Sequence, residues 1–163
     1  MKKGNVVLDT ILVIVILFIL ALTLPFVYQF ITEYNTELQA DSEVSQSVKN
    51  FSADATTKWP QWTDNAFVLI LVLAWMFILV ASFMIDSHPI FFVFSLILLF
   101  FVAGFAITLS NSYQEMVSTD ADMTNFSINY PKTIFIMEHL GHFAVAMGIS
   151  VSLVLYGKLR GPT

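Results

Sequence analysis

Four strongly apolar stretches constrain the fold of this chain more than any other feature. They cover residues 10–31, 66–85, 89–109 and 133–156. The hydrocarbon core of a bilayer is about 30 Å thick, and a helix needs roughly 20 apolar residues to cross it. In lipid, only helices and closed barrels satisfy every backbone polar group. The sequence therefore predicts an all-α integral membrane protein, a four-helix bundle in which each stretch forms one transmembrane helix.

The composition agrees with lipid as the main solvent of the chain. Of the 163 residues, 57% are hydrophobic and 12% are charged, whereas a soluble domain has about 25% charged residues. The chain has no cysteine, which excludes a disulfide, a thiolate metal site and a cysteine nucleophile. Its formal net charge of −5 argues against nucleic acid as a partner, because binding to phosphates needs clustered Lys and Arg. We expect a single transmembrane domain over residues 1–163.

The basic residues predict the orientation of the chain. Most of them lie in the two short tails: Lys2, Lys3, Lys158 and Arg160. Basic residues near helix ends stay on the cytoplasmic side. We therefore expect both termini on the cytoplasmic-equivalent side, and the acidic segments 32–65 and 110–132 on the outside.

The first apolar stretch is interpreted as a retained span. It is longer than the 7–15 apolar residues of a signal peptide, and no small-residue cleavage pattern follows it. A prepilin-type leader is an alternative, because Lys2, Lys3 and Gly4 precede the stretch and Asp9 is the fifth residue after Gly4. The three further spans argue against it.

The fourth stretch is the only one that contains titratable side chains of functional interest: Glu138, His139 and His142. Helical spacing places Glu138 and His142 on one face, with His139 nearby. Charges at membrane depth are costly, so such residues point to function. Three interpretations stay open: a shallow position in the outer headgroup region close to Lys132, a proton or ion site, and a metal site.

Small residues recur along the same stretch at helical spacing: Gly141, Ala144, Gly148 and Ser152. Ridges of this kind let helices approach closely in lipid. The partner is either another span of this chain or a second copy. For the protein as a whole we expect a homo- or hetero-oligomer.

The first outer segment lacks glycine, and we expect the first helix to continue through it toward Lys49. Four apolar residues give it a thin stripe suited to contact with a partner protein: Leu38, Val44, Val48 and Phe51. A solvated connection without a partner is the alternative. Both outer segments carry an Asn-Phe-Ser triplet, at Asn50 and Asn125, which matches the acceptor pattern for N-glycosylation.

No phosphate-binding loop, nucleotide fingerprint or hydrolase motif occurs in the chain. We therefore expect no enzyme activity, no catalytic residue and no cofactor.

One turn carries a resemblance to a known group of proteins. The sequence MIDSHPIFF over residues 84–92, with the short basic start at 1–4 and the ending at 155–158, resembles small four-span proteins of tailless icosahedral viruses that have an internal lipid membrane. The resemblance implies a virion membrane protein, present in many copies, that links the bilayer to the capsid and has no catalytic residues.

The sequence thus predicts a structural or scaffolding membrane protein within a larger assembly, with other membrane or capsid proteins as partners. It would reside in a virion internal membrane or a host cell membrane. The alternative is a small oligomeric pore, holin-like or conducting ions or protons, in which Glu138, His139 and His142 line the path.

Overall fold

The computed structural model describes residues 6–84, 89–119 and 126–159. This part of the chain is helical and contains no strand: α1 is Val6–Ala40, α2 Gln46–Met84, α3 Pro89–Thr119, α5 Pro131–Glu138 and α6 Leu140–Leu159. One further helical turn covers 126–129. The predicted all-α class is confirmed, and four helices, α1, α2, α3 and α6, are long and apolar enough to cross a membrane.

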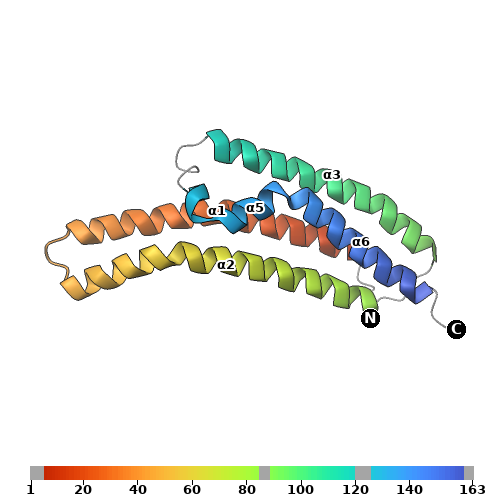
Figure 1. Ribbon diagram of the computed structural model, residues 1–163, viewed down its shortest axis with the longest axis horizontal. Coiled ribbons are helices and arrows are strands. Elements are labelled where there is room, and N and C mark those ends of the chain that lie inside the picture. Colours follow the sequence, from red (N-terminus) through yellow and green to blue (C-terminus); the bar gives the residue numbers. More distant parts are fainter. Residues whose placement is uncertain (1–5, 85–88, 120–125, 160–163) are drawn as a thin grey trace.

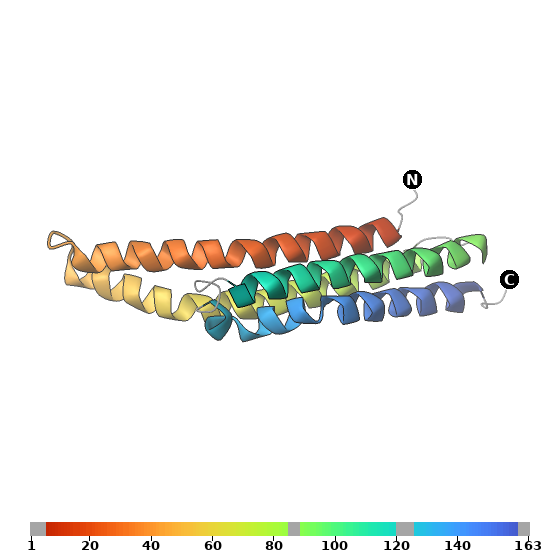
Figure 2. The same ribbon diagram turned by 90° about the horizontal axis from the view of Figure 1, so that it is seen from above.

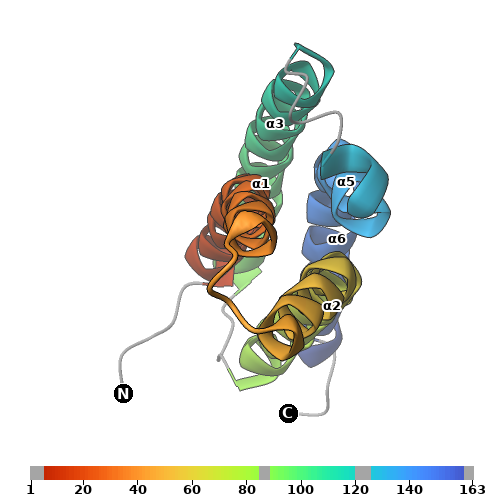
Figure 3. The same cartoon turned by 90° about the vertical axis from the view of Figure 1, so that its left-hand side faces the viewer.

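The helices form an elongated bundle with unequal members. α1 and α2 run side by side and extend past the other helices at one end of the molecule, whereas α3 and α6 extend past them at the other end (Figures 1 and 2). Seen end-on, α1 and α6 lie between α2 and α3 (Figure 3). The first turn of α1 and the last turn of α6 lie at the same end of the bundle.

The far ends of α1 and α2 project beyond the other helices as a helical hairpin (Figure 1). We call this hairpin the arm: residues 32–40 of α1, the turn 41–45 and residues 46–63 of α2. The 39 residues of α2 are nearly twice the number that a bilayer requires. About half of α2 is therefore available to the arm.

The tip of the arm is closed by hydrogen bonds between its two helices. Gln39 Nε2 donates to the Lys49 carbonyl oxygen at 2.8 Å, and Lys49 Nζ donates to the Gln39 carbonyl oxygen at 2.9 Å. The backbone N–H of Glu43 donates to Asp41 Oδ1 at 2.8 Å, a local turn that competes with the helix. For this reason α1 ends at Ala40 and does not continue toward Lys49 as the sequence suggested.

The core of the four-helix part is apolar and draws on every helix. Its fully buried members include Leu17 of α1, Ile78 of α2, Ala106 of α3 and Met147 of α6. The outer faces also carry large apolar side chains, and Phe100 is 79% exposed. Such extensive apolar exposure is unfavourable in water and favourable against lipid tails. The buried and exposed faces together are those of a membrane bundle.

α6 packs closely against α3 at the two glycines of its small-residue ridge. A Cβ added at Gly148 would overlap the Leu99 side chain, and one at Gly141 would overlap Ile107. Ala144, between them, is buried, and Ser152 is half-buried. The ridge thus meets a helix of the same chain at these positions, as close approach in lipid requires.

Candidate functional site

The fourth apolar stretch contains a helix break at the titratable cluster. Where the sequence predicts one continuous helix over 133–156, α5 ends at Glu138, His139 has φ −108° and ψ 17°, and α6 begins at Leu140. The break is local, because helical backbone hydrogen bonds continue on both sides of it. The His139 N–H donates to the Phe135 carbonyl, and the Phe143 N–H donates to the His139 carbonyl.

Side chains of α3 satisfy the backbone at this break. The Glu138 carbonyl oxygen accepts hydrogen bonds from Ser110 Oγ at 2.8 Å and from Gln114 Nε2 at 3.2 Å. Non-helical backbone near membrane depth needs such partners. Sequence reasoning missed Ser110 and Gln114, although they are four residues apart on one helix face, at the point where the apolar stretch of α3 ends.

The three predicted site residues do lie together at the break. Glu138 and His142 are exposed and His139 is half-buried. The rings of His139 and His142 are 5.7 Å apart, and His139 stacks on Phe135 at 4.5 Å. His139 Nδ1 lies 2.9 Å from the Phe135 carbonyl oxygen; because that oxygen can only accept, Nδ1 carries the proton of this bond.

Among the described residues, the structure adds no ion pair and no further metal ligand to this cluster. In the part of the chain that the structure describes, no ion pair joins Glu138 to a histidine, and no group of three or more His, Cys, Asp or Glu side chains could hold a metal ion. Glu138 also lies beside Ser110, at the polar end of α3. This placement favours the shallow interpretation of the cluster.

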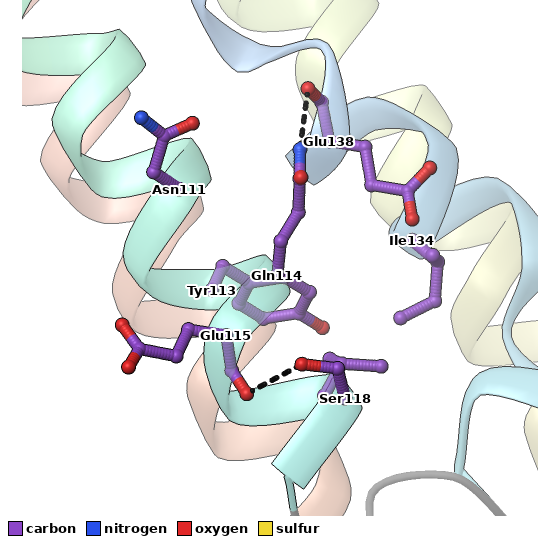
Figure 4. A pocket seen from close by; sticks show the side chains of 8 residues that line it. Asn111, Tyr113, Gln114, Glu115, Ser118, Ile134 and Glu138 are labelled. Carbon is purple, nitrogen blue, oxygen red and sulfur yellow. Dashed lines mark hydrogen bonds between the residues drawn. The ribbon is translucent and has the colours of Figure 1, made fainter.

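A pocket of about 470 Å³ lies between α3 and α5, next to the break (Figure 4). Its lining combines polar and apolar surface, contributed by Asn111, Tyr113, Gln114, Glu115, Val117, Ser118, Ile134 and Glu138. The Tyr113 side chain is 1% exposed, and its hydroxyl has no hydrogen-bond partner among the described residues. A buried hydroxyl without a hydrogen-bond partner lowers the stability of a protein by about 1–3 kcal/mol. The Tyr113 hydroxyl is therefore a candidate to bind a ligand in this pocket.

A buried carboxylate holds the start of α5. Asp64 of α2 is 3% exposed. Its Oδ1 accepts hydrogen bonds from the Thr133 N–H at 2.7 Å and the Thr133 hydroxyl at 2.8 Å, and its Oδ2 accepts one from the Lys132 N–H at 3.2 Å. Tyr130, at the N-cap, makes no side-chain cap. A carboxylate from another helix therefore caps α5, where the helix dipole favours negative charge.

Tyr130 links the same region to α1 and α2. It is fully buried, its hydroxyl lies 3.1 Å from Thr63 Oγ1, and its ring stacks on Phe126 at 4.1 Å and meets Tyr28 edge-on at 5.7 Å. Burial raises the pKa of Tyr130, an effect that the Thr63 hydrogen bond partly opposes. Asp64 and Tyr130 together fix α5 against α2.

Comparisons with protein families, with curated proteins and with solved structures found no match to this chain. The fold itself defines the class: four apolar helices indicate a multi-pass membrane protein. The turn at Asp86, Ser87 and His88, which carries the resemblance to viral proteins, lies outside the described residues. So does Asn125, whereas Asn50 is exposed on α2.

Proposed function

We propose that this chain is a structural, scaffolding membrane protein whose bundle sits in the bilayer and whose arm binds a partner protein in a larger assembly. The observation that carries the proposal is the arm itself, a helical hairpin that projects past the other helices (Figure 1). The termini would lie on the cytoplasmic-equivalent side and the arm on the outer side, in line with the distribution of basic residues.

The surface of the arm suits protein contact. Phe51 is 76% exposed, and Val48, one turn earlier on α2, is exposed too. Leu38 and Val44 are half-buried within the hairpin. The predicted apolar stripe thus divides into two half-buried residues and two exposed ones. Burial of an exposed aromatic side chain in an interface is strongly favourable.

The resemblance to viral four-span proteins gives the proposal a specific form. In that form the chain is a component of a virion internal membrane, present in many copies, and the arm connects the bilayer to the capsid shell. A host cell membrane complex would use the same geometry with a different partner.

The test is purification in native lipid without harsh detergent, with mass spectrometry of the proteins that co-purify. We expect a partner in fixed ratio with the wild-type chain. The double variant Val48→Asp/Phe51→Asp should lose it, and Ser47→Asp, an exposed polar position on the same arm, should keep it. A chain that emerges alone as a closed homo-oligomer would overturn the proposal.

A second candidate is a small oligomeric pore for ions or protons. It is favoured by the exposure of Glu138 and His142 beside the helix break, because side chains on the outside of one bundle are free to line a path between copies. Glu138→Gln and His142→Ala should then reduce conductance in planar bilayers. Unchanged conductance in both variants, or none in the wild type, would reject the pore.

A further inference from the structure

We propose that the pocket between α3 and α5 binds a primary ammonium group, supplied either by an aminophospholipid headgroup or by a free alkylamine. The inference is independent of the arm and of any partner protein. The pocket has a volume of about 470 Å³. A water molecule takes about 30 Å³ in the liquid, so the pocket has room for a small organic group.

The hydroxyl of Tyr113 identifies the pocket as a binding site. The side chain is 1% exposed and its oxygen has no hydrogen-bond partner among the described residues. In Figure 4 the hydroxyl points from α3 across the pocket toward α5. Buried polar groups in native proteins are almost always paired. A ligand that supplies a hydrogen bond to this oxygen would complete the pairing.

The negative charge of the pocket lining favours a positively charged ligand. Glu115 and Glu138 line the pocket, and no Lys, Arg or His is among the lining residues. Glu138 makes no ion pair within the described residues. A positive ligand would therefore be attracted to Glu138, and an anionic one would be repelled.

The remaining lining residues favour an organic ammonium over a metal ion. Val117 and Ile134 give the pocket apolar walls, which suit the methylene groups next to an amine. The described residues include no cluster of three carboxylate or imidazole ligands. A primary ammonium has three N–H donors, enough for the Glu138 carboxylate and the Tyr113 oxygen, which both lie on the α5 side of α3 in Figure 4.

The pocket lies at the depth where phospholipid headgroups are expected. Asn111 and Gln114 follow directly on the apolar stretch of α3, so the pocket begins where the hydrocarbon would end. The ammonium of a phosphatidylethanolamine could reach it from the bilayer, and a free amine could reach it from the solvent.

The experiment measures binding by native mass spectrometry and by the shift in thermal unfolding of the detergent-purified full chain. Phosphatidylethanolamine, phosphatidylcholine, phosphatidylglycerol and ethylamine are added separately. We expect saturable binding of phosphatidylethanolamine, and weaker binding of phosphatidylcholine, whose quaternary ammonium has no N–H. Equal binding of all three lipids would overturn the proposal. Binding of ethylamine as well would identify a free amine as a sufficient ligand, and its failure would assign the site to the lipid.

Two variants and one control connect the binding to the pocket. Glu138→Gln keeps the shape and removes the charge, and Tyr113→Phe keeps the ring and removes the hydroxyl. Each should weaken binding about tenfold, while Glu37→Gln, the same change at an exposed position on the arm, should leave it unchanged. Because Tyr113→Phe removes an unpaired buried hydroxyl, it should fold at least as well as the wild type. Unaltered affinity in both pocket variants contradicts the inference.

Discussion

Asp64 shows how much a single side chain can contribute when its partners are distant in sequence. It joins α2 to the start of α5 by three hydrogen bonds. We expect Asp64→Asn to lower the free energy of unfolding by about 1–3 kcal/mol, because the amide has one acceptor oxygen and no charge. Thermal unfolding in detergent measures this loss.

Asp54→Asn is the matched control for that change. Asp54 pairs with Lys58 at 2.8 Å, and both side chains are more than half exposed. Exposed pairs of this spacing contribute at most about 0.5 kcal/mol, so the control should unfold nearly as the wild type does. Equal unfolding temperatures for the two variants would show that capping of α5 by Asp64 contributes little to the stability of the protein.

Tyr130 predicts a loss of stability at high pH. Burial raises its pKa in the folded state, whereas in the unfolded chain the phenol ionises near pH 10. Its contribution is therefore fully present below about pH 10 and is lost as the pH rises through the folded pKa. Tyr130→Phe cannot ionise, so its stability should fall less steeply than that of the wild type above about pH 10. Parallel pH profiles of unfolding would contradict this assignment.

The sequence identified residues whose contacts are close along the chain and missed those whose contacts are distant along it. Glu138, His139 and His142 lie within one helical turn, so their spacing alone predicted that they would be neighbours. Ser110 and Asp64 act on residues 28 and 69 positions away. No local pattern in a single sequence encodes such pairs, and only the folded chain reveals them.

The packing of α6 against α3 depends on two glycines. At Gly148 a larger side chain would collide with Leu99, whereas at Gly104, on α3, a Cβ would meet nothing within 4 Å. Gly148→Leu should therefore lower the free energy of unfolding by about 1–3 kcal/mol or more, while Gly104→Leu should leave it nearly unchanged. Unfolding in detergent distinguishes the two. A stable Gly148→Leu chain would mean that the α3–α6 interface repacks freely.

The four long helices were predictable because apolar length alone identifies them, and the start of α3 at Pro89 was predicted too. Most of their other ends were not. α2 begins at Gln46, well before the apolar stretch 66–85 from which the helix was predicted. It starts this early because polar residues of the arm form hydrogen bonds across the hairpin. The break at His139 was missed for the opposite reason. Its neighbours have no proline or charge pattern that ends a helix, and the α3 side chains that satisfy it lie elsewhere in the chain.

The molecule as a whole predicts which sites lie across a membrane from one another. The chain has no cysteine, so single cysteines report accessibility without background. We expect Ser42→Cys, in the turn of the arm, and Lys158→Cys, near the end of α6, to react with a membrane-impermeant maleimide from opposite faces of sealed vesicles. Reaction of both from the same face would rule out the four-span topology.

Under the proposed function, the length of the arm would set the distance between the bilayer and the partner protein. The α1 side of the arm, the nine residues 32–40, extends about 14 Å at 1.5 Å per residue, and the hydrogen bonds at its tip keep the two helices in register. A protein held at the tip would stand at that height above the membrane surface. In an assembly with many copies, the length of this hairpin would set a uniform gap between the bilayer and the layer that surrounds it.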